Sequence, residues 1–224
     1  MAQLILGIDD AGRGPLIGPM ILAGVLLDKN GEEVLKKHNV RDSKTVLHPV
    51  RIKLAEIIKE TALNHHIVKS LPEDIDKAIT SGTNLNTLEA IKTAEIINYI
   101  NNEKEKIKVI VDCPSVNIKA WRLKLLEFIK HKDNLELICE HKADANHISV
   151  SAASILAKVT REEEIEKLKL EYGNFGSGYP ADPTTKNFLK SSGKKFSNSG
   201  LFRKTWATWK VLFPNKSQAL LGEF

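Results

Sequence analysis

Cysteine is scarce in this chain of 224 residues, which has only two, Cys113 and Cys139. Two thiols are too few for a disulfide framework or a four-thiolate zinc site, so we expect a reduced, cytoplasmic protein. No run of residues approaches the roughly 20 apolar positions of a membrane span. The first residues lead directly into a predicted strand, and no signal peptide is expected. The composition therefore argues against secreted disulfide scaffolds and integral membrane proteins.

Acidic residues are missing from a long stretch near the carboxyl end, between Pro183 and Gly222. The same stretch contains eight basic residues: Lys186, Lys190, Lys194, Lys195, Arg203, Lys204, Lys210 and Lys216. The net charge of the whole chain is only +5, so the charge is unevenly distributed. An acid-free basic segment indicates a polyanionic partner such as nucleic acid.

Strand and helix patterns alternate over most of the chain, which predicts an α/β fold with a mixed sheet. Strands are expected at residues 4–8, 19–27, 65–71, 107–111 and 135–139, with the second antiparallel to the first. Helices are expected at residues 49–61, 72–80, 86–101, 118–129 and 149–172. The dipeptide Asn30-Gly31 predicts a hairpin turn after the second strand.

Two adjacent carboxylates, Asp9 and Asp10, follow the first apolar strand and precede Gly12-Arg13-Gly14. Neighbouring residues of a strand point to opposite faces, so both acids can approach one site only where the strand ends or bends. The glycines allow such a bend. A pair of acids can also simply cap a β-turn, which is the alternative interpretation.

Acids also follow two later predicted strands, Asp112 directly and Asp144 a few residues on. Functional groups of α/β sheets gather at strand ends, so these acids are expected to share a site with the first pair. Like charges repel at close range, so such a cluster needs a cation. The histidines form no pair at helical spacing, which favours an all-oxygen Mg²⁺ or Mn²⁺ site over zinc. Each acid taken alone could instead be a loop or helix-cap residue.

Five short motifs occur in order along the chain. They are Gly7-Ile8-Asp9-Asp10-Ala11-Gly12-Arg13-Gly14-Pro15, Asp42-Ser43-Lys44, Val111-Asp112, Glu140-His141-Lys142-Ala143-Asp144 and Gly176-Ser177-Gly178-Tyr179-Pro180. Together they resemble ribonuclease HII of the archaeal type, from the first strand to about Leu189. The resemblance implies a ribonuclease-H-like mixed β-sheet flanked by helices, with a helical C-terminal extension. We expect a catalytic domain over residues 1–182 and a basic helical region over 183–224.

The resemblance also implies an activity. The family hydrolyses the RNA strand of RNA/DNA hybrids and nicks DNA at embedded ribonucleotides, leaving 3′-hydroxyl and 5′-phosphate ends. We therefore expect a monomeric, metal-dependent endonuclease of DNA replication and repair, with hybrids and ribonucleotide-containing duplexes as partners.

The four catalytic and metal-binding acids of the family correspond to Asp9, Asp10, Asp112 and Asp144, with Mg²⁺ or Mn²⁺ as cofactor. In a two-metal mechanism Asp9 is the candidate bridging ligand, and Asp144 would hold one metal or its water. This chain departs from the family at Asp10, where the family usually has the longer Glu. We therefore expect activity that is reduced or shifted in preference toward the larger Mn²⁺.

Substrate contacts are implied for a second group of residues. By resemblance, the backbone of Gly12, Arg13 and Gly14 touches the ribose 2′-hydroxyl, which distinguishes RNA from DNA. Tyr179 would stack on the sugar of the following deoxynucleotide, and Lys44 is a candidate phosphate anchor. The alternatives are a tyrosine wedged in a Gly-Pro turn and a solvated loop lysine. No Gly-Lys-Ser/Thr follows the glycines, so a P-loop is not expected.

Aromatic residues are interleaved with the basic residues of the tail, namely Phe188, Phe196, Phe202, Trp206, Trp209 and Phe213. This pattern suits a surface that follows a nucleic-acid backbone. The alternative is that the aromatic residues pack on the core while the lysines point outward. Gln218, Leu221 and Phe224 resemble the anchors of a sliding-clamp-binding peptide, for which a disordered tail is the alternative.

Two other functions remain open from the sequence. The first is a protein of the same fold that binds hybrids without cutting them, which the departure at Asp10 makes conceivable. The second is a phosphoryl-transfer enzyme acting on small molecules. The basic tail and the turn around Tyr179 argue against the second.

Overall fold

The computed structural model describes residues 3–40 and 47–214. The described chain divides into two compact units. The first contains residues 3–11, 21–40, 47–69 and 85–161, and the second contains residues 12–20, 70–84 and 162–214. The boundary expected at residue 182 lies inside the second unit, and the assignment of a catalytic domain up to that residue stays a prediction.

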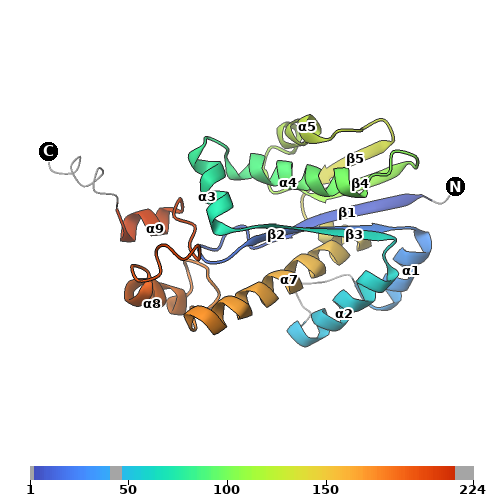
Figure 1. The fold of residues 1–224 in the computed structure, drawn as a ribbon. Helices are drawn as coiled ribbons and strands as arrows, with labels where there is room; N and C mark the ends of the chain where they lie inside the picture. The colour runs from blue at the N-terminus through green and yellow to red at the C-terminus, as the bar shows by residue number, and fades with distance from the viewer. Residues whose placement is uncertain (1–2, 41–46, 215–224) are drawn as a thin grey trace. The chain divides into compact units, whose positions relative to one another are not determined.

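A five-stranded sheet is the centre of the first unit (Figure 1). Its strands are β1 (Leu4–Ala11), β2 (Met20–Leu27), β3 (Asn64–Ser70), β4 (Ile107–Asp112) and β5 (Leu135–Glu140). They lie in the order β3-β2-β1-β4-β5. β1 pairs antiparallel with β2 and parallel with β4, and β4 pairs parallel with β5. The predicted mixed sheet is therefore confirmed.

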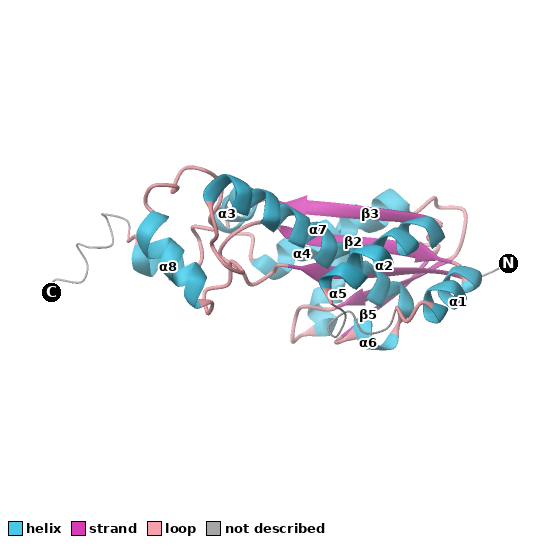
Figure 2. Ribbon diagram, turned by 90° about the horizontal axis from the view of Figure 1, so that it is seen from below, coloured by secondary structure: helices cyan, strands magenta, loops and turns pink. Residues whose placement is uncertain are grey.

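Helices cover both faces of this sheet. The helices of the described residues are α1 (Lys29–Lys37), α2 (His48–Thr61), α3 (Pro72–Thr80), α4 (Leu85–Ile100), α5 (Ile118–Phe128), α6 (Ala143–Asn146), α7 (Ile148–Tyr172), α8 (Pro183–Ser192) and α9 (Ala207–Leu212), of which α3, α8 and α9 belong to the second unit. One face packs on α1, α2 and the first half of α7, and the other carries α4 and α5 (Figure 1); Figure 2 shows the sheet turned by 90°. Every residue of β2 is buried, as expected for an inner strand covered on both sides. No helix in the described ranges is long and apolar enough to cross a membrane.

The close approach of α7 to β1 depends on Gly7. A Cβ atom at this position would lie 2.1 Å from the backbone carbon of Ser149 and 2.2 Å from the nitrogen of Val150. No other residue fits there without moving the helix. The first turns of α7 therefore lie directly against β1, two residues before its acids.

Two local predictions were wrong. β1 does not end at Ile8 but continues to Ala11, because its pairing with β2 extends through both acids. Asn30-Gly31 does not form a hairpin turn but lies in the first turn of α1. The Asp28 carboxylate accepts a hydrogen bond from the Gly31 amide (2.7 Å) and caps this helix. A side-chain cap thus prevails over the turn preference of the dipeptide.

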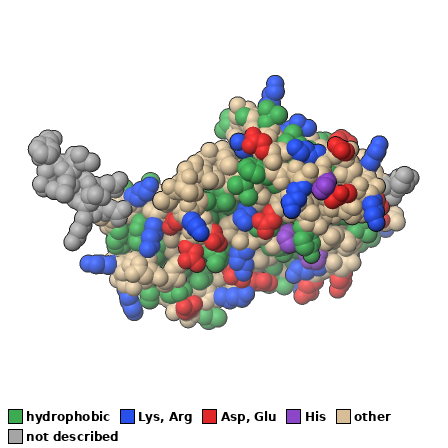
Figure 3. All heavy atoms as spheres, turned by 45° about the horizontal axis from the view of Figure 1, so that its top comes forward, with side chains coloured by type: hydrophobic (Ala, Val, Ile, Leu, Met, Phe, Trp, Pro, Cys, Tyr) green, Lys and Arg blue, Asp and Glu red, His purple; other side chains and the backbone are tan. Residues whose placement is uncertain are grey.

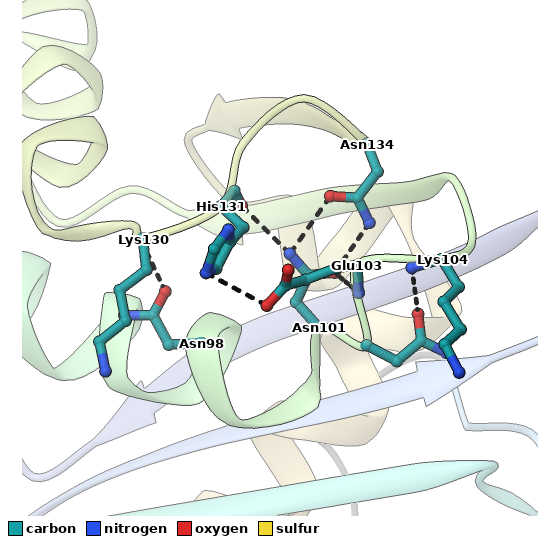
Figure 4. A network of polar contacts seen from close by, with 8 residues as sticks. Asn98, Asn101, Glu103, Lys104, Lys130, His131 and Asn134 are labelled. Carbon is teal, nitrogen blue, oxygen red and sulfur yellow. Dashed lines mark hydrogen bonds and ion pairs between the residues drawn. The ribbon is translucent and has the colours of Figure 1, made fainter.

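Asparagine side chains connect the ends of α4 and α5 to the turns before β4 and β5 (Figure 4). Asn98 donates to Phe128 O (3.0 Å) and accepts from the Lys130 amide (2.9 Å). Asn134 donates to the Asn101 side chain (2.8 Å) and also bonds the backbone of the α4–β4 turn. These bonds hold the amino-terminal ends of two parallel strands, so the network supports the sheet at the edge opposite the acids.

The second unit has its own hydrophobic core. Its buried members are Leu16, Ile17, Ile165, Phe175, Phe188, Leu189, Leu201, Phe202 and Trp209. The aromatic residues of the tail thus pack inward, as the alternative interpretation held. The six lysines between residues 183 and 214 are exposed, whereas Arg203 is fully buried.

Candidate active site

Asp9 is a buried acid near the end of β1, with 7% of its surface exposed. Its pairing partner Ala23 belongs to the core beneath α7, so the Asp9 side chain lies on the α7 face of the sheet. Its Oδ1 accepts a hydrogen bond from the Asp10 amide (2.7 Å), and the Ser154 hydroxyl of α7 provides a second hydrogen bond. The carboxylate is therefore held between its own strand and the long helix.

The pKa of Asp9 is raised from 3.8 to about 8. The largest cause is burial, and the negative charges of Asp10 and Asp112 also contribute to the rise. The hydrogen bonds from Ser154 and from the Asp10 amide act in the opposite direction. The rise shows that negative charge at this position is poorly compensated by the surrounding protein. A cation at this edge of the sheet would relieve both the burial cost and the repulsion.

A hydrogen bond links the end of β4, which carries Asp112, to the start of α6, which carries Asp144. Asp112 is the last residue of β4, and its Oδ1 accepts a hydrogen bond from the Ala143 amide (3.1 Å) at the start of α6. Lys142, directly before α6, has a left-handed conformation with φ 57°, which turns the chain into this helix. The next residue of α6, Asp144, is 8% exposed. The position of Asp144 thus depends on the carboxylate of Asp112.

A small cavity of about 10 Å³ lies at this end of the sheet and is lined by Asp9, Asp10 and Asp112. Glu89 and Thr93 of α4 line the same cavity, and each is 2% exposed. The space is about that of one water-sized sphere. Sequence reasoning missed Glu89. The available signal was an acid and a threonine four residues apart, which lie on the same face of a helix.

The types of ligand fit a hard divalent cation, because carboxylate oxygens are what Mg²⁺ and Mn²⁺ prefer. The side-chain positions do not yet form a closed set of ligands. Within residues 3–40 and 47–214, no three His, Cys, Asp or Glu side chains are placed to hold one ion together. The pleat explains part of this, since adjacent Asp9 and Asp10 lie on opposite faces of β1.

A second polar chain reaches Asp9 from α7. Lys158 Nζ donates a hydrogen bond to Ser154 Oγ (2.9 Å), and Ser154 in turn bonds Asp9. Ser154 is fully buried, and Lys158 is half-buried one turn further along the helix. This arrangement places a cationic side chain one hydroxyl away from the buried acid. Sequence reasoning missed both roles.

The predicted substrate-binding residues of the second unit lie in two interlocked loops. Gly12 has φ 83°, a conformation that favours glycine, and Gly14 lies under the ring of Tyr179. A Cβ on Gly14 would be 3.3 Å from Tyr179 Cε1. Gly178 O accepts hydrogen bonds from the amides of residues 16 and 17 (2.9 and 3.2 Å). Tyr179 is 43% exposed.

Four predicted site residues fall outside the described residues. They are the candidate phosphate anchor Lys44 and the candidate clamp-binding residues Gln218, Leu221 and Phe224. Their roles stay predictions.

Comparison with known proteins gives a consistent result. The sequence model of the family Ribonuclease HII matches residues 6–209. Ribonuclease HII of Pyrococcus furiosus is 41% identical over 223 residues, which cover 97% of this chain and 96% of the relative. The ribonuclease H2 structure from Pyrococcus horikoshii OT3 has a TM-score of 0.84 at 37% identity and covers 94% of this chain and 97% of that one.

A third relative is the ribonuclease HII in the PCNA:RNase HII complex from Archaeoglobus fulgidus, with a TM-score of 0.79 at 36% identity. The alignment covers 91% of this chain and 95% of that one. The predicted ribonuclease-H-like sheet flanked by helices is thereby confirmed. The family match and these relatives, each spanning nearly all of the chain, show that this protein belongs to the ribonuclease HII family of ribonuclease H endonucleases.

Proposed function

We propose that this chain is a divalent-metal-dependent endonuclease that hydrolyses the RNA strand of RNA/DNA hybrids and nicks duplex DNA at embedded ribonucleotides. The products would carry 3′-hydroxyl and 5′-phosphate ends. The observation that carries the proposal is the buried Asp9, whose pKa is raised to about 8 by burial and by the charges of Asp10 and Asp112. A site with this electrostatic character suits a bound cation. Membership of the family supports the class of reaction.

Asp9, Asp10, Asp112 and Asp144 would hold Mg²⁺ or Mn²⁺. A bound metal of this kind makes a water nucleophilic and stabilises the leaving oxygen of a phosphodiester. The protein's own contribution is orientation. Ser154 and the Asp10 amide fix one carboxylate, and the Ala143 amide fixes that of Asp112.

Recognition of the ribonucleotide would fall to the second unit. Glycines at positions 12 and 14 permit close approach of a backbone to a sugar, and an amide group there would bond the ribose 2′-hydroxyl. Arg13 would pair with a phosphate. The exposed ring of Tyr179 lies against Gly14, so it is available to stack on the neighbouring deoxyribose.

The exposed lysines between residues 183 and 214 would bind the phosphate backbone. In the view of Figure 3, basic side chains are interspersed with acidic ones and form no single large patch. Each lysine that contacts a phosphate would contribute to the binding energy. Affinity should fall as salt rises, with a slope set by the number of such contacts.

A labelled duplex with a single ribonucleotide tests the cleavage. Incubation with Mg²⁺ or Mn²⁺ should produce a nick at the ribonucleotide, and Asp9→Asn should abolish it while binding is retained. Asp28→Asn is the matched control, because it makes the same change at a helix cap where asparagine serves as well as aspartate. Binding without a nick in either metal would instead assign the non-cleaving hybrid-binding function.

We also propose that the last residues bind a sliding clamp through Gln218, Leu221 and Phe224. The support is the sequence pattern, together with the Archaeoglobus fulgidus relative, whose structure is that of a complex with PCNA. Deleting residues 218–224 should abolish association with the clamp in a pull-down and leave nicking unchanged. Unchanged association after the deletion would contradict this part of the proposal.

A further inference from the structure

Arg203 is the largest fully buried side chain of the protein as described, with none of its surface exposed. Its guanidinium donates hydrogen bonds to three carbonyl groups of the loop after β1. Nη2 bonds Gly12 O (2.6 Å), Nη1 bonds Arg13 O (2.7 Å), and Gly18 O accepts from both Nε (3.1 Å) and Nη2 (2.9 Å). In the sequence, Arg203 is one of the basic residues that indicate a nucleic-acid partner. In the structure its side chain instead binds backbone carbonyl groups of the protein.

The segment 201–206, which contains Arg203 and Trp206, holds the loop by further hydrogen bonds. Its backbone pairs with the loop, with Arg203 N donating to Leu16 O (2.9 Å) and Gly18 N donating to Leu201 O (3.1 Å). Trp206 lies over the guanidinium, 5.0 Å from Arg203 Cζ to the ring centre. Its Nε1 donates to Gly14 O (3.1 Å). The backbone of the loop between Gly12 and Gly18 is therefore held by hydrogen bonds from one short segment.

Burial of a guanidinium is costly unless its donors are satisfied, and this arrangement satisfies them with neutral carbonyl oxygens. The planar fork of arginine can reach several carbonyls at once, which the single ammonium of lysine cannot do with the same geometry. The position of these carbonyls is therefore determined by Arg203 rather than by the glycine-rich loop itself, which is intrinsically permissive.

Fixing the carbonyls also fixes the direction of the amides. In a trans peptide the C=O and the following N–H point in opposite directions, and no cis peptide occurs in the described chain. Because Arg203 binds the carbonyls of Gly12 and Arg13, the amides of Arg13 and Gly14 point away from the guanidinium. These are the groups that would meet a ribose under the proposed function.

We propose that Arg203 and Trp206 are positioning residues for ribonucleotide specificity. They would not touch the nucleic acid. Instead they hold the Arg13 and Gly14 amides in the one orientation that distinguishes a ribose from a deoxyribose. Trp206 and Tyr179 both contact the loop at Gly14. Loosening the segment 201–206 would therefore also displace Gly14, against which the Tyr179 ring lies. This inference rests on the proposed function.

The test compares three variants in the nicking assay with unlabelled competitor duplexes. Trp206→Phe removes the indole N–H but keeps an aromatic ring, Arg203→Lys keeps the charge but loses the fork, and Trp209→Phe is the control. Trp209 packs on Phe202 and Phe213 (ring centres 4.7 and 4.5 Å apart), and within the described chain its side chain makes no hydrogen bond to the loop. The measured quantity is the preference for a competitor with one ribonucleotide over the same duplex without it.

We expect Trp206→Phe to lower this preference about fivefold, the effect of one lost hydrogen bond. Arg203→Lys should lower it more, if it folds as judged by circular dichroism. Trp209→Phe should lower the melting temperature but keep the preference. A normal preference in Trp206→Phe would overturn the proposal, even if Arg203→Lys does not fold. A wild-type protein that neither nicks nor prefers ribonucleotides would instead refute the proposed function.

Discussion

Replacing Asp9 by Asn should abolish nicking and, in the absence of metal, stabilise the fold. The pKa of Asp9 is raised from 3.8 to about 8, chiefly by burial, so its ionised form opposes folding near neutral pH. Each pKa unit corresponds to about 1.4 kcal/mol, which sets an upper bound of about 6 kcal/mol for the penalty. The asparagine keeps an oxygen for the Asp10 amide but brings an NH₂ group that needs an acceptor, which costs part of the gain.

We therefore expect a net gain of about 2 kcal/mol in the free energy of unfolding, within the range found when buried charges are replaced. For a chain of this size that corresponds to a rise of about 4–8 °C in melting temperature. The gain should depend on pH. Below about pH 4 both folded and unfolded wild type are protonated at Asp9, so the variant gains little; the gain should grow up to about pH 8.

Urea unfolding in EDTA at about pH 5 and about pH 8 measures this directly. Asp28→Asn is the control in the same unit, because asparagine is as good a cap as aspartate and its stability should change little at either pH. Adding Mg²⁺ should raise the melting temperature of the wild type and leave Asp9→Asn nearly unchanged. An Asp9→Asn variant that is no more stable than the wild type at the higher pH would refute the conclusion that this acid is held at a cost.

Three further predictions follow from contacts of the acids and of the tyrosine turn. Ser154→Ala removes a hydrogen bond that lowers the pKa of Asp9, so the ionisation of Asp9 should shift to higher pH and the acidic limb of the pH–rate profile should move with it; an unmoved limb would argue against the Ser154 contact. Asp10→Glu lengthens the carboxylate that lies on the face opposite Asp9, so it should reach a shared ion more easily and raise the nicking rate severalfold in Mg²⁺, whereas equal or lower activity would show that the shorter side chain is adapted to this site. Asp182 accepts bonds from Ser177 and Thr184 that lower its pKa to about 2, so it stabilises the fold above about pH 4 and this contribution is lost toward about pH 2; Asp182→Asn should lower the melting temperature at neutral pH and leave it nearly unchanged at about pH 2.

The strand-end acids illustrate what the sequence could predict. Apolar runs followed by Asp9 and Asp112 predicted two strands with an acid at the end of each, and in the structure these strands, β1 and β4, are neighbours in the sheet. The adjacent Asp10 raises the pKa of Asp9 in the folded protein, as expected for like charges nearby. These inferences succeeded because strand periodicity and charge repulsion are properties of short segments.

The features that were missed depend on contacts between distant segments. In the sequence, Glu89 is one of several polar residues of a helix. Only the folded chain shows that it lines the same cavity as the strand-end acids. In the sequence, Gly31 is typical of a turn. In the structure its amide donates a hydrogen bond to the Asp28 carboxylate at the start of α1. Arg203 reads as a surface cation because composition cannot show that carbonyl groups some 190 positions earlier enclose it. Such partners become visible only in the folded chain.

Arg203 and Asp9, two of the buried ionisable residues that the structure describes, show how hydrogen bonding separates a structural role from a reactive one. Arg203 is buried with its donors directed at carbonyl oxygens, so its charge is compensated within the protein and its removal should cost order in the loop. Asp9 is buried with two hydrogen bonds and with the charges of Asp10 and Asp112 opposing its own, so its charge is compensated only in part. Mutation of the first should therefore lower both stability and specificity, whereas mutation of the second should raise stability as it removes activity. The burial of Asp9 is thus costly, whereas the guanidinium nitrogens of the similarly buried Arg203 all donate hydrogen bonds. Perturbed acids of this kind are typical of functional sites, which agrees with the proposed binding of a cation by Asp9.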